Sequence, residues 1–170
     1  MTSGKNNKEK IQRDFLNDGL IIRPILDKKS HNWIRVKLIS LIKEELKKMN
    51  IKIPNNFDLF NDIHKLISFS ELNDFRLKIF RNMNLLSDFE KNYYNVAKPY
   101  LDVLVGDELA MQNKINFSIQ CPKDTSSILP IHADTWDGNS PFELVVWLPM
   151  VDCYKTKSMY MLPYKENSKF

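Results

Sequence analysis

The order of hydrophobic and polar positions changes along the chain. Up to about residue 111, apolar side chains recur every three or four residues, which predicts amphipathic helices. From residue 112 onward, apolar and polar side chains alternate, which predicts strands. Helices that precede strands in this way indicate an α+β fold.

The clearest predicted helix covers residues 30–50. Ser30 is placed to cap its first turn, and apolar side chains from Ile34 to Leu46 line one face. Further helices are predicted over residues 8–19, 57–67, 70–84 and 88–106. The last of these contains Pro99, where we expect a kink or a break.

Four strands are predicted in the second part of the chain, over residues 114–122, 127–135, 142–151 and 157–163. The first strand places the polar side chains of Asn116, Ser118 and Gln120 on one face. The third strand is apolar on both faces and is therefore expected to be buried. We interpret residues 1–170 as one domain, with a mainly helical part over 1–111 and the first strands of a sheet over 112–170.

Composition narrows the class of protein. A hydrophobic content of 43% excludes wholesale disorder, and 25 basic against 21 acidic residues give a net charge of only +4. There is no basic stripe with interleaved aromatics, so a nucleic-acid partner is not expected.

We find no membrane-length apolar run and no signal peptide, so we expect a cytoplasmic protein without a membrane partner. The two cysteines form no CxxC pair and are interpreted as reduced, packed thiols.

The residues with the clearest chemistry are His132 and Asp134, which are separated by one residue. On a strand, positions i and i+2 project from the same face, so the two side chains can meet at one ion. Imidazole and carboxylate together suit Fe(II), Mn(II) or Zn(II), and two histidines with one carboxylate form the ligand set of non-haem Fe(II) oxygenases. The alternative interpretation is a surface or capping pair without a metal.

The phrase IHADTWDGNSPFELVVWLPMVDCYKTKSMYMLP, residues 131–163, resembles the core of 2-oxoglutarate/Fe(II)-dependent oxygenases. It is most similar to a subfamily of the phytanoyl-CoA-hydroxylase-like superfamily found with bacterial surface-carbohydrate genes. The specific part of the resemblance covers about residues 113–163. It implies a double-stranded β-helix, or jelly roll, behind an N-terminal helical layer.

The resemblance also implies a site and a reaction. His132 and Asp134 take the places of the first two iron ligands, with Fe(II) and 2-oxoglutarate as cofactors. Retention of the aspartate implies a hydroxylase, and the expected substrate is a small sugar or sugar-linked molecule of surface-carbohydrate biosynthesis.

Seven other positions are candidates for the same site. Asn116, Ser118 and Gln120 are candidates for contact with 2-oxoglutarate, the alternative being a solvated strand face. The other four are candidates for contact with substrate, and they are Thr135, Trp136, Asp137 and Trp147. The first three of these also suit a plain turn, and a tryptophan in a sheet also suits a core.

The chain departs from the family pattern after Asp134. The only histidines are His31, His64 and His132, and the last arginine is Arg81, so the family's distal histidine and its 2-oxoglutarate arginine are both missing. We expect a C-terminally truncated fragment that is inactive alone. A natural truncation, and completion of the site by His31 or His64, are the alternatives.

Two other function classes stay open: a non-catalytic β-sandwich-like binding module, and a cupin-like metal isomerase. The oligomeric state is open as well.

Overall fold

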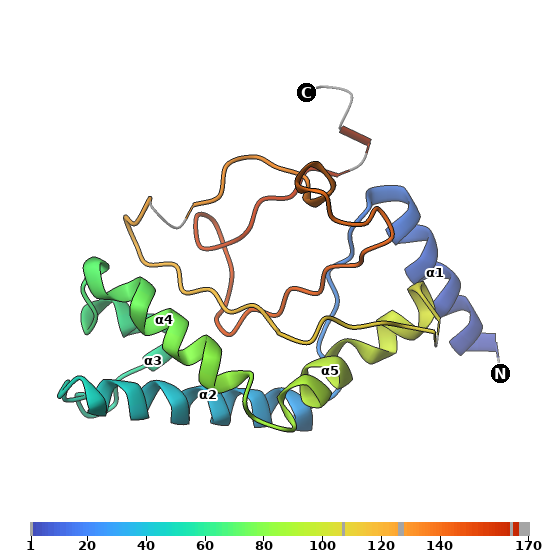
Figure 1. The fold of residues 1–170 in the computed structure, drawn as a ribbon. Helices are drawn as coiled ribbons and strands as arrows, with labels where there is room; N and C mark the ends of the chain where they lie inside the picture. The colour runs from blue at the N-terminus through green and yellow to red at the C-terminus, as the bar shows by residue number, and fades with distance from the viewer. Residues whose placement is uncertain (1, 107, 126–127, 164, 167–170) are drawn as a thin grey trace. The chain divides into compact units, whose positions relative to one another are not determined.

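The structure, a computed structural model, describes residues 2–106, 108–125, 128–163 and 165–166. The regular elements within these residues are all helical (Figure 1). In chain order they are α1 (Thr2–Asp18), α2 (Lys28–Lys48), α3 (Leu59–Asp62), η1 (Ile63–Lys65), α4 (Phe69–Met83), α5 (Phe89–Leu104) and η2 (Asp134–Asp137), the η elements being 3₁₀-helices.

The helices predicted from the apolar period are confirmed. Three of them, α2, α4 and α5, agree with the predicted ranges to within a few residues, and residues 57–67 form α3 followed by η1. Helix α1 begins earlier than predicted, at Thr2. Helix α5 continues through Pro99, so the expected break is absent there.

The cap of α2 is Asp27, and the prediction of Ser30 for this role was wrong. The Asp27 carboxylate accepts the backbone N–H of Ser30 at 2.9 Å and the Ser30 hydroxyl at 2.8 Å. These bonds satisfy a donor of the first turn that has no partner within the helix. They also hold the pKa of the Asp27 carboxyl below its usual value, the backbone bond being the larger cause. Ser30 itself is buried within the first turn.

The chain divides into two compact units, whose boundary falls within α2 between Arg35 and Val36. The first unit contains residues 1–35, 87–114 and 152–170. In it α1 lies against α5, where Ile11 is buried and the Gln12 amide donates to the Val103 carbonyl at 2.9 Å. The apolar side of α5 supplies much of this unit's core.

The second unit contains residues 36–86 and 115–151. Its core contains the side chains of Leu46, Phe75, Ile79 and Met83, each at most 1% exposed. The carboxylate of Glu45 is also buried, and the Lys78 ammonium of α4 pairs with it at 3.2 Å. A buried carboxylate needs such a partner, so this ion pair links α2 to α4.

The prediction of an α+β fold with a jelly roll was wrong. Within the described residues after α5, the structure contains the short helix η2 and no strand, and Figure 1 draws no arrow among these residues. The four predicted strands are therefore absent from the described parts of their ranges. Residues 142–151 are also not buried, since Phe142 is 92% exposed and Val145 is 63% exposed.

The alternation that predicted the strands is nevertheless real. From Ile115 to Cys121, buried or half-buried side chains alternate strictly with exposed ones. A period of two shows that a segment is extended, whereas a sheet also requires cross-strand pairs with another segment. Prolines at 122, 130, 141, 149 and 163 end or interrupt the extended segments, and each removes a backbone donor.

Candidate metal site

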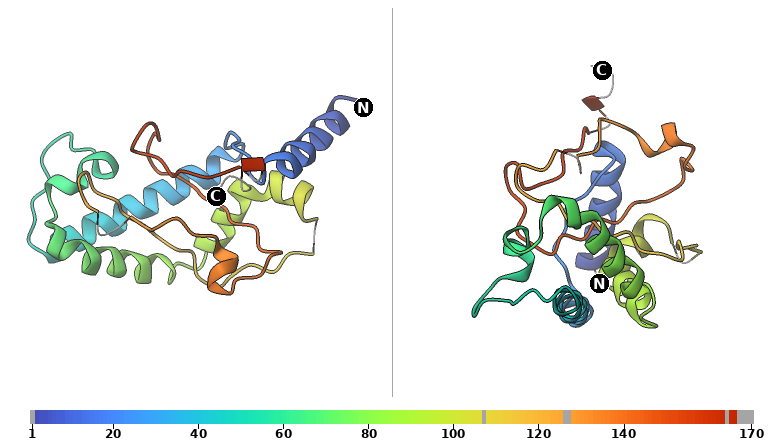
Figure 2. Two further views of the ribbon diagram at one scale, coloured as in Figure 1. Left: turned by 90° about the horizontal axis from the view of Figure 1, so that it is seen from above. Right: turned by 60° about the vertical axis from the view of Figure 1, so that its left-hand side comes forward.

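His132 and Asp134 lie close together in the second unit. The His132 Nε2 atom and the Asp134 Oδ1 atom are 3.6 Å apart, and the two side chains are 39% and 48% exposed. Asp134 is the first residue of η2, the helical turn that is coloured orange in Figure 2. The expected strand is absent, but the two side chains meet as the spacing predicted.

The other nitrogen of His132 is held by the backbone. Its Nδ1–H donates to the Pro130 carbonyl at 2.8 Å, because a carbonyl can only accept. This bond assigns the Nδ1 proton and leaves Nε2 as the atom that faces Asp134. Histidines that bind metals are oriented by such a bond to the nitrogen that does not bind the ion. The sequence did not predict this role for Pro130.

The η2 turn fixes the backbone of Asp134. Gly138 follows η2 with a φ of 89°, and its N–H donates back to the Asp134 and Thr135 carbonyls. The N–H of Asn139 also donates to the Asp134 carbonyl, at 3.2 Å. Glycine suits this left-handed position because a side chain there is strained. The structure thus contains the turn that was the alternative interpretation of Thr135, Trp136 and Asp137.

The stretch of sequence that contains the pair is acidic. Between Lys123 and Lys155 the chain has no lysine or arginine. The same stretch carries five carboxylates, on Asp124, Asp134, Asp137, Glu143 and Asp152. A chain with a net charge of +4 therefore places its His–Asp pair in its most acidic stretch, which favours cations over anions. This signal was visible in the sequence and was missed there.

The pair fits two positions of a divalent metal site. With metal–ligand distances of about 2.1 Å, two ligands lie about 3.0 Å apart at a right angle and about 3.4 Å apart at a tetrahedral angle. The observed 3.6 Å needs only a small movement to reach either value. In the part of the chain that the structure describes, no group of three or more His, Cys, Asp or Glu side chains gathers to hold a metal.

His31 and His64 therefore complete no such group in the described residues. His64 lies in η1, and His31 lies in the first turn of α2. The Nε2 atom of His31 is buried without a hydrogen-bond partner. Burial lowers the pKa of His31, with the charges of Arg35 and Lys28 as smaller causes, so the imidazole resists protonation.

The other predicted site residues lie in three places along the chain. Thr135, Trp136 and Asp137 lie on η2 with Asp134 and are exposed. Trp147 is 51% exposed and so is not a core residue. Asn116, Ser118 and Gln120 share an exposed side of the extended segment before Cys121. All three are uncharged, and none can neutralise the distal carboxylate of 2-oxoglutarate.

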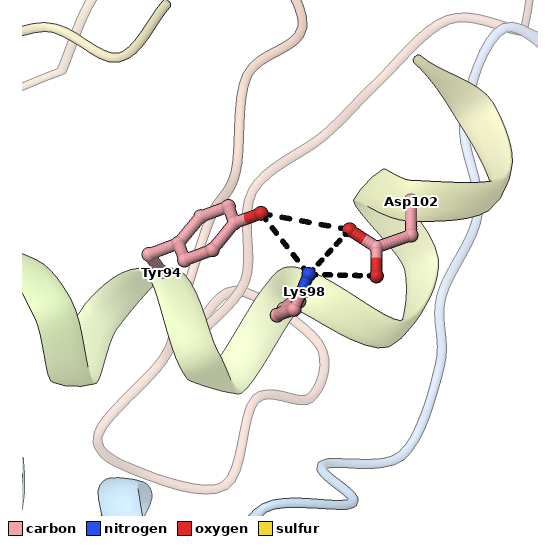
Figure 3. Close-up of polar contacts among 3 residues, drawn as sticks. All are labelled: Tyr94, Lys98 and Asp102. Carbon is pink, nitrogen blue, oxygen red and sulfur yellow. Dashed lines mark hydrogen bonds and ion pairs between the residues drawn. The ribbon is translucent and has the colours of Figure 1, made fainter. Parts of the chain in front are cut away.

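A second polar cluster lies on α5 and is of a different kind. Figure 3 shows Lys98 between Tyr94 and Asp102, with its ammonium 2.8 and 2.9 Å from the Asp102 carboxylate oxygens. The hydrogen bond to Asp102, and then the one to Tyr94, raise the pKa of Lys98. A lysine held in its charged form cannot act as a base. The spacing of i to i+4 makes this cluster a surface ion pair of the helix.

Comparison of the chain with models of protein families, with characterised proteins and with solved structures finds no match in any of the three. None of the described helices combines the length and the apolar character that crossing a membrane requires.

Proposed function

We propose that this chain carries part of the iron centre of a 2-oxoglutarate/Fe(II)-dependent oxygenase, with His132 and Asp134 as metal ligands. The observation that carries the metal part is the 3.6 Å separation of His132 Nε2 from Asp134 Oδ1, with the Nδ1 atom already bonded to Pro130. Imidazole and carboxylate are ligands that Fe(II) accepts, and the acidic stretch of sequence around the pair favours a cation.

The support for 2-oxoglutarate is of a different kind. It comes from the resemblance of residues 131–163 to the oxygenase family, because the residues between Lys123 and Lys155 include no lysine or arginine to pair with the distal carboxylate. These residues do not fit the co-substrate, so we derive no reaction step through it. When bound, Fe(II) supplies Lewis acidity and one-electron chemistry at the pair. The chain's own contribution is to orient His132 through Pro130 and Asp134 through η2.

The proposed substrate is a small sugar or sugar-linked molecule. The side chains beside Asp134 support a polar substrate, because η2 presents a hydroxyl, an indole and a carboxylate on Thr135, Trp136 and Asp137. The proposed location is the cytoplasm, since a reducing compartment keeps iron ferrous and keeps the thiols of Cys121 and Cys153 reduced.

Measurements of metal affinity test the proposed metal site, and measurements of 2-oxoglutarate binding separately test the proposed oxygenase chemistry. We expect the parent chain to bind Fe(II) under anaerobic conditions, and His132→Ala to weaken binding by about 10-fold or more. The matched control is His64→Ala, which removes a histidine outside the pair and should bind as the parent does. Equal Fe(II) affinity in the parent and in His132→Ala would show that His132 is not a metal ligand and would contradict the proposed metal site.

Adding 2-oxoglutarate to the Fe(II)-loaded chain then tests the oxygenase part. A 2-oxo acid that chelates Fe(II) gives a visible charge-transfer absorption, which we expect in the parent and not in His132→Ala. Metal binding without this absorption would be consistent with the proposed metal site but would contradict the assignment to 2-oxoglutarate chemistry. We expect no turnover under dilute conditions, because two protein ligands leave the facial geometry unfixed.

A further inference from the structure

The side chains of the His–Asp pair are partly exposed to solvent. His132 Nε2 and Asp134 Oδ1 are 3.6 Å apart on side chains that are 39% and 48% exposed. A divalent ion bound by these two atoms keeps at least two coordination positions that the pair does not fill.

Large apolar side chains surround the pair in the sequence and are exposed in the structure. Ile131, directly before His132, is 88% exposed, and Trp136, two residues after Asp134, is 73% exposed. Leu129 is 72% exposed. Exposed apolar side chains next to a polar pair are typical of an interaction surface, and tryptophan is enriched among the residues that anchor protein interfaces.

The charge of this surface decides which partner fits. Asp134 and Asp137 lie together on η2, and no lysine or arginine occurs between Lys123 and Lys155. Two copies of this surface repel each other unless a cation lies between them. A divalent ion reduces that repulsion, and the second copy brings another imidazole and another carboxylate to the ion.

We propose that a second copy of this chain covers the His–Asp pair and completes its metal site. One divalent ion would then be shared by two chains, bound by His132 and Asp134 of each copy about a two-fold axis. Self-complementary contacts of this kind are the commonest way in which soluble proteins form oligomers. The resulting ligand set contains the two histidines and one carboxylate of an Fe(II) oxygenase. This proposal rests on the proposed role of His132 and Asp134 as metal ligands.

Titration with Co(II) tests the shared ion, because the ion is redox-stable in air and its absorption reports its ligands. We expect saturation at one Co(II) per two chains and a doubling of the molar mass measured by light scattering, both reversed by a chelator. One Co(II) per chain at the monomer mass would overturn the shared site and leave the proposed metal ligands in place. Failure to bind Co(II) would overturn both proposals.

Variants in which exposed apolar side chains are replaced by serine test the interaction surface itself. The double variant Ile131→Ser, Trp136→Ser keeps both ligands, and we expect it to weaken Co(II)-dependent dimerisation by about 10-fold or more. The matched control is Ile22→Ser, Leu85→Ser, which changes two side chains that are 86% and 80% exposed elsewhere in the chain. We expect the control to dimerise as the parent does. If the two double variants dimerise equally well, the apolar side chains of Ile131 and Trp136 do not form part of the dimer contact.

Discussion

The hydroxyl of Tyr93 is the clearest case in which the environment of a single residue sets a measurable property. Burial in α5 raises the pKa of Tyr93 from 10.0 to about 12. The folded protein therefore keeps this proton in a pH range where the unfolded chain loses it. The corresponding stabilisation is fully present below pH 10 and is lost as the pH rises towards 12.

An ultraviolet titration checks this prediction at the absorption band of ionised tyrosine. We expect a component of the folded protein with a pKa of about 12, which Tyr93→Phe removes. Tyr94→Phe is the matched control on the same helix and should leave that component in place. If the component survives in Tyr93→Phe, the assignment is wrong.

The sequence predicted the meeting of His132 and Asp134 for a reason that was only partly correct. One intervening residue brings their side chains within 3.6 Å, but through an extended residue followed by a 3₁₀ turn rather than through a strand face. The hydrogen bond from His132 Nδ1 to the Pro130 carbonyl could not be predicted, because every residue type has a backbone carbonyl that can accept such a bond. The acidic stretch could have been predicted, since it depends on composition alone.

At the scale of the element, Asp27 determines how α2 begins. Its carboxylate bonds to both the N–H and the hydroxyl of Ser30. We expect Asp27→Ala to destabilise the folded protein and to lower the melting temperature, because it leaves a first-turn donor without its partner. Asp27→Asn retains an acceptor and should recover part of the loss. Thermal unfolding followed by circular dichroism measures all three proteins.

The same cap predicts a pH dependence with a definite sign. Because its pKa is lowered in the folded state, Asp27 contributes stability that is present above its ordinary value of 3.8 and is lost as the pH falls through and below that value. The difference in melting temperature between the parent and Asp27→Ala should therefore shrink on acidification. A difference that is constant down to pH 3 would contradict the role of the ionised carboxylate.

Helices were predicted well and strands were not, and the reason is the range of the contacts involved. The hydrogen bonds of α2 and α4 join residues four apart, so a local apolar period is enough to indicate them. Strands depend on partners that lie far away in sequence. Residues 115–121 have the alternation of a strand without a strand partner in the described structure, and sequence pattern cannot distinguish these two cases.

At the scale of the whole molecule, the stability of the second unit rests on its buried apolar core. Phe75 is 1% exposed, and we expect Phe75→Ala to reduce the free energy of unfolding by about 3–5 kcal/mol. That loss is a large share of the roughly 5–15 kcal/mol typical of a folded protein. Denaturant unfolding measures it directly.

The matched control for this prediction is on the same helix. Phe69 begins α4 and is 59% exposed, so Phe69→Ala removes the same side chain without opening a cavity. We expect its effect to stay within about 0.5 kcal/mol. Comparable losses in the two variants would show that the buried position of Phe75 is not what stabilises the unit.

The absence of lysine and arginine between Lys123 and Lys155 has a practical consequence for mapping the site. Trypsin cleaves only after these two residue types, so a complete digest releases the stretch from Asp124 to Lys155 as one peptide. His132, Asp134, all of η2 and the exposed Trp136 are on it. If iron binds at the pair as proposed, it would generate oxidants locally when ascorbate and oxygen are supplied. Mass spectrometry of this one peptide would then show which side chains, Trp136 first among them, carry the added oxygen.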